Sequence, residues 1–258
     1  MELAFYFPQG KRKALTFSYD DGSPWDCQLL EIFNRYGMKA TFNLHTLNKD
    51  LSGIKNLYAG HEIACHGKTH PYLERIPAMS ALEDILENRK ELEAATGSII
   101  NGMAYPFGTY SNQVKEILRS SGILYSRTIR STSSFSIPED FLEWHPTCHH
   151  NENLKNIAES FLKRNYPFQL CYVWGHSYEF NNQNNWEVIE EFCAATAHQE
   201  NIWYATNMEI FEYITAARSL IFSADSRIVK NPSAIPVWIG TDSGKILEVR
   251  GGATLCIF

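Results

Sequence analysis

The regular alternation of strand-like and helix-like segments constrains the fold of this chain more than any other feature. Short runs rich in β-branched and aromatic residues recur between longer stretches that have apolar residues at helical spacing. Sequences of this kind build a mainly parallel sheet whose faces are covered by helices. We therefore predict an α/β fold. The expected strands are 13–19, 39–44, 62–65, 99–105, 169–174 and 202–205, and the expected helices are 25–36, 79–95, 112–120, 151–163, 184–198 and 207–218.

A different pattern begins near residue 220. Short apolar runs are separated there by turn sequences such as 241–244 (TDSG) and 251–252 (GG). Runs of this length with such turns are typical of antiparallel strands, and a segment this small does not fold alone. We expect a main α/β unit over residues 1–219 and a small C-terminal antiparallel β extension over residues 220–258 that packs on it.

Composition and charge argue against several classes of protein. The 258 residues are 44% apolar and 20% charged, which is ordinary for a globular protein, and the net charge is −6. The longest basic run is only 11–13, so we expect no nucleic-acid partner. No stretch approaches the roughly 20 apolar residues of a membrane helix. The first residues lack a signal-peptide pattern, so we expect a cytoplasmic protein, or an extracytoplasmic one if a leader precedes Met1. The sequence leaves the oligomeric state open.

The six cysteines form no CxxC pair, so a thiolate zinc site is not expected. Two adjacent carboxylates, Asp20 and Asp21, instead follow the first long predicted strand. Neighbouring negative charges raise each other's pKa unless a positive group lies nearby, and a divalent cation is one such group. The alternative is that one carboxylate caps the next turn or helix and the other is solvated.

Two histidines four residues apart, His66 and His70, follow the predicted strand 62–65. At this spacing two imidazoles can bind one metal ion from a helix or from a tight loop. Gly67 and Pro71 favour the loop. Taken alone, a pair of this kind is more often two surface or turn histidines than a metal site.

A further polar position, His176, follows the predicted strand 169–174. Imidazole titrates near neutral pH and can act as a general acid, although a histidine at a strand end is often structural. In sheets of this kind the chemistry gathers at the carboxyl ends of the strands, where all three polar clusters fall. One aspartate and two histidines make a three-ligand metal site, a second aspartate can accept a proton, and a separate histidine can donate one. The combination predicts metal-assisted acyl hydrolysis.

These residues, in this order, resemble the NodB-homology polysaccharide deacetylases, carbohydrate esterase family 4. The segment 16–22 (TFSYDDG) is similar to the family motif TF(S)(F/Y)DDG, which implies that Asp20 is the catalytic base and Asp21 a metal ligand. His66 and His70 align with the two metal-binding histidines of H(S/T)xxH. His176 stands at the histidine of the LxIH motif, which implies the general-acid role. The resemblance spans roughly residues 13–176 and implies the family's irregular (β/α) barrel.

Two more segments resemble family motifs around the groove. The segment 104–108 (AYPFG) resembles RxP(F/Y)G, which lines the groove, and 140–144 (DFLEW) resembles DxxDW, which supports the catalytic histidine. The resemblance implies a set of substrate-binding or supporting residues: Tyr105, Pro106, Phe107, Asp140, Glu143, Trp144 and Trp174.

Three positions depart from the family pattern. The serine or threonine after the first metal histidine is Gly67, so one hydroxyl that fixes the loop is missing. Glu143 replaces an aspartate and gives a longer arm for holding the catalytic histidine. The arginine that orients and balances the catalytic carboxylate is Ala104.

The missing arginine leaves Asp20 in need of another cation. Arg127 and Arg130 are candidates, and the segment 145–150 (HPTCHH) could place an extra imidazole in the cleft. The other interpretation is that the histidines of this segment are exposed or structurally bonded.

We expect a metal-dependent hydrolase that removes acetyl groups from a carbohydrate, N-acetyl in preference to O-acetyl. Asp20 takes a proton from the attacking water, a backbone N–H of Tyr105 or a neighbour steadies the oxyanion, and His176 protonates the leaving atom. One divalent ion is expected at Asp21, His66 and His70. Zn²⁺ is the default, with Co²⁺, Ni²⁺ and Fe²⁺ as alternatives.

Ala104 also motivates two alternative functions. One is a C–N hydrolase of a small amide or cyclic ureide on the same scaffold. The other is a catalytically inactive carbohydrate-binding protein that kept the barrel. A non-haem iron oxygenase shares the ligand set of two histidines and one carboxylate, but the motif order and the strand context favour the deacetylase.

Overall fold

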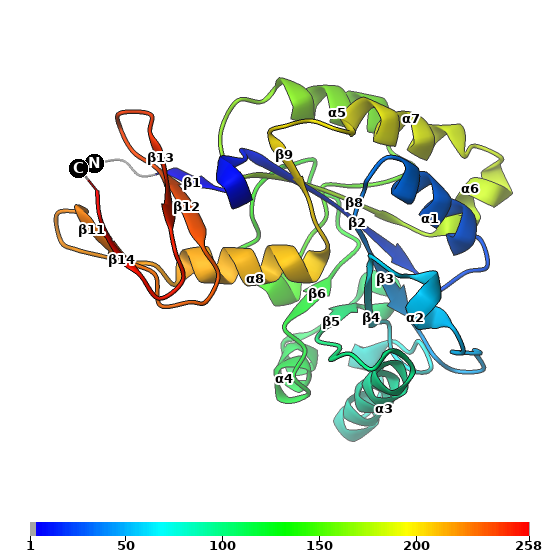
Figure 1. Ribbon diagram of the computed structural model, residues 1–258. Helices are drawn as coiled ribbons and strands as arrows, with labels where there is room; N and C mark the ends of the chain where they lie inside the picture. Colours follow the sequence, from blue (N-terminus) through cyan, green and yellow to red (C-terminus); the bar gives the residue numbers. More distant parts are fainter. Residues whose placement is uncertain (1–3, 258) are drawn as a thin grey trace.

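A parallel sheet of eight strands forms the centre of the protein (Figure 1). The strands lie in the order β6-β5-β4-β3-β2-β8-β7, and β9 pairs with the start of β2. The structure is a computed structural model that describes residues 4–257. The bounds of these strands are β2 Lys13–Asp20, β3 Ala40–Leu44, β4 Glu62–Cys65, β5 Gly102–Ala104, β6 Tyr125–Arg127, β7 Cys148–His149, β8 Gln169–Gly175 and β9 Ile202–Tyr204.

Helices connect the strands and cover the sheet. In Figure 1, α1, α5, α6 and α7 lie beside β2 and β8, and α3 and α4 lie at the β4–β5 end. The α-helices are α1 Asp26–Arg35, α2 Ile54–Leu57, α3 Ala78–Thr96, α4 Asn112–Ser120, α5 Leu154–Lys163, α6 Ser177–Gln183, α7 Glu187–Thr196 and α8 Asn207–Arg218. Four short 3-10 helices are η1 Pro8–Gly10, η2 Leu73–Arg75, η3 Pro106–Gly108 and η4 Phe141–Glu143. The predicted α/β class is confirmed, and the strands form a distorted half-barrel.

Strand β2 shows how the chain places polar groups inside this half-barrel. Every residue of the strand is buried, as expected for a central parallel strand. Residues 15, 17 and 19 belong to the apolar cluster under α1 and α7. Thr16, Ser18 and Asp20 alternate with them and face the other way, toward polar partners on other elements. The strand therefore ends with a carboxylate that points into the polar interior.

Most of the predicted elements form, with differences at short segments. Helix α6 was not predicted, and the predicted helix 184–198 is the shorter α7, which follows α6 after Asn184 in the left-handed region at φ 48°. Strands β6 and β7 were also not predicted. They contain three and two residues, too few for a period-2 pattern to stand out.

The C-terminal residues form two small antiparallel sheets, in the orders β1-β12-β13 and β10-β11-β14. Their strands are β1 Ala4–Tyr6, β10 Ile221–Phe222, β11 Ile228–Lys230, β12 Val237–Gly240, β13 Ile246–Val249 and β14 Thr254–Cys256. Strand β1 was expected to belong to the main unit, but it pairs with β12. Apolar residues of these sheets share a buried cluster with α8, so the extension packs on the main sheet through that helix.

Two further sequence features have a direct structural counterpart. All six cysteines are free thiols, and four of them are buried as small core residues: Cys65, Cys148, Cys171 and Cys193. Between residues 4 and 257, no helix has both the length and the apolar character needed to cross a membrane.

The contact between Gly102 and Tyr125 gives a test of the packing between β5 and β6. A Cβ at Gly102 would lie 2.3 Å from Tyr125 Oη. The tyrosine is fully buried and donates to Glu62 at 2.6 Å, so it has no free space to move into. We expect Gly102→Ala to lower the free energy of unfolding by about 3 kcal/mol, measured by urea denaturation.

Gly37→Ala is the control, because Gly37 has φ 67° and open space around it. This substitution should lower the free energy of unfolding by only about 1 kcal/mol, the cost of a left-handed backbone at a residue with a Cβ. Equal losses in the two variants would show that the tyrosine contact does not limit the packing.

Candidate metal centre and active site

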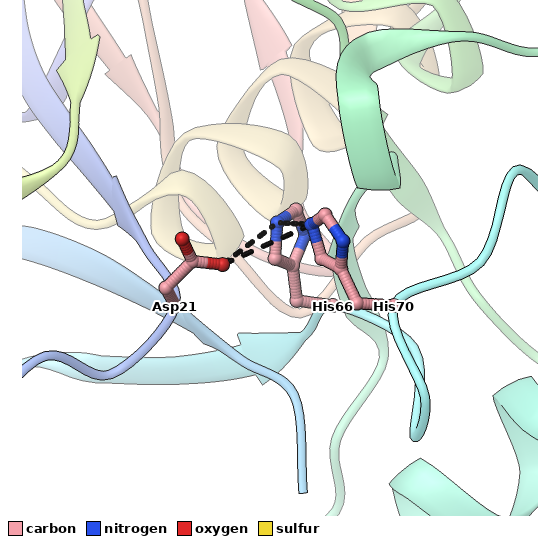
Figure 2. A group of neighbouring side chains, drawn as sticks. All are labelled: Asp21, His66 and His70. Carbon is pink, nitrogen blue, oxygen red and sulfur yellow. Dashed lines mark hydrogen bonds and ion pairs between the residues drawn. The ribbon is translucent and has the colours of Figure 1, made fainter. Parts of the chain in front are cut away.

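Asp21, His66 and His70 bring three metal-binding atoms together beyond the ends of β2 and β4 (Figure 2). Nε2 of His66 lies 3.1 Å from Nε2 of His70. Oδ1 of Asp21 lies 3.7 Å from the first of these nitrogens and 3.8 Å from the second. Three donors at such separations can surround one ion with bonds of roughly 2.0–2.2 Å. The structure thus places the three predicted ligands as one group.

The protonation of His66 suits metal binding. Its Nδ1 lies 2.8 Å from the carbonyl oxygen of Ala104 and donates to it, which leaves the lone pair of Nε2 free to face the other two ligands. Burial lowers the pKa of His66 to about 4, so the ring is neutral near pH 7. A neutral imidazole with a free Nε2 is the form that a divalent ion requires. The donor set therefore fits such an ion.

Two of the three candidate ligands hold a strained backbone. Asp21 has φ 75° and His70 has φ 54°, in the left-handed region that non-glycine residues rarely adopt. The N–H of Asp21 donates to the carbonyl oxygen of Asn43 at 3.0 Å, and its own carbonyl oxygen accepts from Lys49 Nζ. Strain of this kind persists only where surrounding contacts hold it, and it clusters at functional sites.

Helix α3 holds the histidine loop through two polar residues one turn apart. Asp84 accepts the N–H of Lys68 at 2.8 Å and the N–H of the next residue at 2.9 Å. Asn88 accepts the N–H of His66 at 3.0 Å. A Cβ at Gly67, where φ is 71°, would lie 2.8 Å from Asp84 Oδ2. Glycine is therefore required at this position, and the aspartate fixes the loop in place of the missing hydroxyl.

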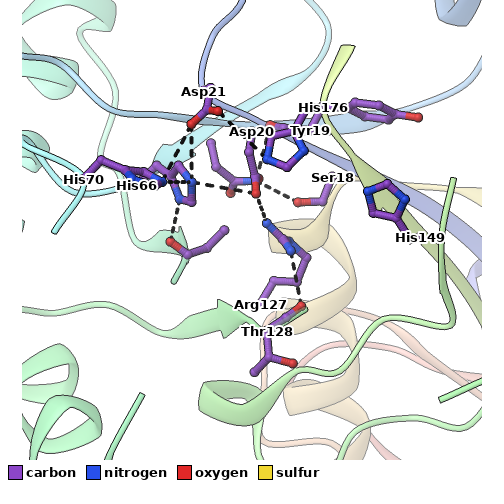
Figure 3. Close-up of polar contacts among 12 residues, drawn as sticks. Ser18, Tyr19, Asp20, Asp21, His66, His70, Arg127, Thr128, His149 and His176 are labelled. Atoms are coloured by element: carbon purple, nitrogen blue, oxygen red, sulfur yellow. Dashed lines mark hydrogen bonds and ion pairs between the residues drawn. The ribbon is translucent and has the colours of Figure 1, made fainter. Parts of the chain in front are cut away.

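Asp20 forms a buried ion pair with Arg127 (Figure 3). Asp20 is 2% exposed and Arg127 is fully buried. The other carboxylate oxygen accepts from Asn43 Nδ2 at 2.8 Å, and the guanidinium carbon lies 4.3 Å from the centre of the Trp174 ring. Burial raises the pKa of Asp20, but Arg127 and then His66 outweigh it and hold the pKa below its usual range. The predicted need for another cation is confirmed, and Arg127 supplies it.

His176 faces the same group of residues from the end of β8. Its Nε2 lies 3.9 Å from Asp21 Oδ2, and its Nδ1 lies 3.4 Å from Glu179 Oε2. The expectation that Asp140 and Glu143 support this histidine is wrong. Both carboxylates contact Lys115 Nζ on α4 instead. Glu179, three residues after His176, takes the place predicted for these two carboxylates.

The remaining expected residues divide between the site and the core. Phe107 is 43% exposed, and its ring centre lies 4.5 Å from that of His70. Trp174 lies under the Arg127 guanidinium. Trp144 and Tyr105 are each 1% exposed, and Pro106 is buried as well, so these three do not offer a surface to a substrate.

Several residues of the site were not found from the sequence. Asn43, Lys49, Asp84 and Glu179 act by holding other residues, and an isolated polar residue on a strand or helix gives no motif. His45 is a further imidazole near the site: its ring centre lies 6.0 Å from that of His70. Its position just after strand β3 is the one signal that a strand-end search could have used.

The geometry of the three ligands predicts a tight metal site. Titration of Zn²⁺ into metal-free protein, followed by calorimetry, should show tight binding at Asp21, His66 and His70. Asp21→Ala should weaken it by more than about 100-fold, because even changes outside the ligand shell cost 10–100-fold. His145→Ala is the control, since that ring contacts Thr128 and not the three ligands. Equal affinity in wild type and Asp21→Ala would contradict the assignment.

The buried ion pair gives a prediction about stability. Arg127→Met leaves a buried carboxylate unpaired and should lower the free energy of unfolding by about 3–5 kcal/mol. The double variant Asp20→Asn/Arg127→Met should recover much of this loss, since it removes both charges. Urea denaturation of the metal-free wild type, the two single variants and the double variant measures this double-mutant cycle. Arg130→Met, at an exposed position, should change stability by less than about 0.5 kcal/mol. An additive cycle would show that the two charges do not interact.

Comparison with known proteins agrees with the motifs and the fold. Residues 8–126 match the family model described as polysaccharide deacetylase. The peptidoglycan deacetylase of Helicobacter pylori is 31% identical over 110 residues, which are 40% of this chain and 36% of that protein. The peptidoglycan-N-acetylglucosamine deacetylase PgdA of Listeria monocytogenes is 29% identical over 109 residues, which are 41% of this chain and 23% of that protein. The match thus spans about a third or less of these relatives.

The solved structures extend the likeness beyond the matched segment. A candidate polysaccharide deacetylase of Mycobacterium smegmatis superposes with a TM-score of 0.63 over 83% of this chain and 94% of that one, at 18% identity. At this identity the likeness shows a shared fold. The motifs, the family model over residues 8–126 and the fold agree in their likeness to the polysaccharide deacetylase family.

Proposed function

We propose that this protein hydrolyses N-acetyl groups of a carbohydrate, with one divalent metal ion that is zinc by default. The observation that carries the proposal is the placement of a base and an acid next to the three candidate ligands. Oδ2 of Asp20 lies 3.7 Å from His66 Nε2, and Nε2 of His176 lies 3.9 Å from Asp21 Oδ2. Acyl hydrolysis needs both groups within reach of one reacting carbonyl.

A divalent ion at Asp21, His66 and His70 supplies a Lewis acid that polarises the acyl carbonyl and acidifies water. Asp20 accepts the proton of the attacking water. Its low pKa keeps it ionised, and the Arg127 guanidinium and the Asn43 amide fix its orientation. The proton acceptor is therefore already in place before a substrate binds.

His176 donates a proton to the leaving nitrogen. Burial alone lowers its pKa, but the contact with Glu179 and the charge of Asp20 outweigh burial and raise the pKa above its usual value. A higher pKa keeps more of the ring protonated near neutral pH, which suits a general acid. An amine is a poor leaving group without a proton, so this residue matters most for amide substrates.

The oxyanion is stabilised by the backbone N–H of Phe107. The N–H of Tyr105 is already bonded to the carbonyl oxygen of Arg127, and that of Gly108 to the carbonyl oxygen of Tyr105. Pro106 has no N–H. Phe107 has φ 57°, and its ring packs beside that of His70, so the residue adjoins the ligand group. Among residues 105–108 this leaves Phe107 as the donor.

The choice of an N-acetylated carbohydrate is supported by the names of two relatives, a peptidoglycan deacetylase and a peptidoglycan-N-acetylglucosamine deacetylase. The alternatives of a ureide hydrolase and of an inactive binding protein relied on the arginine that is absent at Ala104. Because Arg127 supplies a guanidinium to Asp20, that reason for both alternatives is lost.

An acetate-release assay tests this reaction. Zinc-loaded protein should release acetate from N-acetylglucosamine oligosaccharides. Asp20→Asn should lower kcat by about 100-fold or more, because general base catalysis contributes roughly 10²–10⁴-fold. Asp225→Asn, an exposed aspartate in the extension, should leave the rate unchanged and is the control. A full rate in Asp20→Asn would rule out the assigned base, and activity on small cyclic ureides alone would rule out the carbohydrate.

A further inference from the structure

One carboxylate oxygen behind His176 is surrounded by three imidazoles. Oε2 of Glu179 lies 2.9 Å from His150 Nε2, 3.2 Å from His149 Nε2 and 3.4 Å from His176 Nδ1. The same oxygen accepts the backbone N–H of His176 at 3.2 Å. His149 and His150 come from the end of β7, and Figure 3 shows His149 on the side of His176 away from the ligand group. None of these contacts belongs to the motifs from which the site was predicted.

His150 is held rigidly in this cluster. It is fully buried, and its ring packs against the rings of Tyr19 and Phe180, with centres 5.6 Å and 4.0 Å away. A Cβ at Gly175 would lie 2.1 Å from His150 Nδ1. The residue before His176 must therefore be glycine, since any side chain there would displace the imidazole. A rigid His150 in turn fixes the carboxylate beside it.

The proton positions argue against a second metal ion at His149, His150 and Glu179. Nδ1 of His149 accepts the backbone N–H of Asn151 at 3.1 Å, so in the neutral ring the proton is on Nε2, which faces Glu179. A metal ligand needs a lone pair there. His66 in the first group has the opposite arrangement, with Nδ1 donating and Nε2 free. The cluster of His149, His150 and Glu179 is therefore centred on the carboxylate anion of Glu179 and not on a metal ion.

We infer that Glu179, held in place by His149 and His150, is the positioning residue for His176: it fixes the ring with Nδ1 toward Glu179 and Nε2 toward Asp21. The orientation itself does not depend on the reaction, but its catalytic consequence rests on the proposed function. Nδ1 and Nε2 are on opposite sides of the ring, so holding one nitrogen directs the other.

The charge of Glu179 suits this role. Burial raises its pKa, but the contacts with His149, His150 and His176 outweigh burial and hold the pKa well below its usual range. A carboxylate that stays ionised beside Nδ1 also stabilises the positive charge on the ring when both nitrogens carry protons. The same carboxylate is thus a guide for orientation and a counter-charge.

The chain offers a matched control for any change at this position. Glu209 occupies the same place in α8 that Glu179 occupies in α6: each is the third residue of its helix and accepts the N–H of the residue before the helix. The distance is 2.7 Å in α8 and 3.2 Å in α6. Glu209 contacts no histidine among those described, so Glu209→Gln removes a carboxylate with the same local structural role.

The test that does not depend on activity is the tautomer of His176 in metal-free protein. Long-range ¹⁵N–¹H spectra at alkaline pH distinguish a ring protonated at Nδ1 from one protonated at Nε2, and comparison with His176→Gln identifies the signal. We expect the Nδ1–H form in wild type and in Glu209→Gln, and loss of its dominance in Glu179→Gln. An unchanged tautomer in Glu179→Gln would overturn the inference.

Kinetics then separate positioning from a structural role. Aryl acetates release a nitrophenolate that needs no proton, whereas N-acetyl substrates release an amine that does. Glu179→Gln should lower the ratio of kcat/KM for an N-acetylated oligosaccharide to that for 4-nitrophenyl acetate by at least about tenfold. Glu209→Gln should keep the wild-type ratio. An equal loss on both substrates in Glu179→Gln would indicate a merely structural role and contradict the inference. If the tautomer changes as expected but wild type hydrolyses no N-acetyl substrate, the proposed function fails and the positioning role stands.

Discussion

The buried ion pair between Asp20 and Arg127 is the interaction on which the site depends. Moving either charge out of water costs several kcal/mol, so each is tolerated only because the other is present. Arg127 is the register partner of Ala104 on the neighbouring strand. Side chains paired in register project from the same face of a sheet, so a guanidinium from either position can reach the same carboxylate. The small side chain of Ala104 leaves room for the longer one beside it.

The other departures from the family pattern follow the same logic. The hydroxyl missing at Gly67 is replaced by the carboxylate of Asp84, which approaches so closely that only glycine fits. The aspartate replaced by Glu143 has its counterpart in Glu179, three residues after His176 in the chain. In each case a polar group from another position in the sequence makes the contact.

The sequence predicted most of the sheet and the group of Asp20, Asp21, His66, His70 and His176, because strand ends and local spacing are visible in one dimension. Apart from Arg127, one of two candidates for the partner of Asp20, it did not predict which side chains hold these residues. Asp84 lies on a helix and Glu179 follows a strand end by a few residues, and each acts through contacts that only the tertiary structure creates. The prediction for Asp140 and Glu143 was wrong for the opposite reason. They match a motif, but their partner is Lys115 on α4 and not His176. A motif identifies a residue type, whereas the partner depends on packing.

The two adjacent carboxylates at the end of β2 are treated differently by the fold. Asp20 points into the interior and receives the fixed charge of Arg127. Asp21, turned the other way by its left-handed backbone, has side-chain contacts with the ring nitrogens of His66, His70 and His176 at 3.7–3.9 Å. His66 is neutral and offers a lone pair, so its contact does not balance the charge of Asp21 as a guanidinium would. A divalent ion at this point would balance it. One carboxylate is thus held ionised by a fixed cation, and the other lies where a divalent ion would balance its charge.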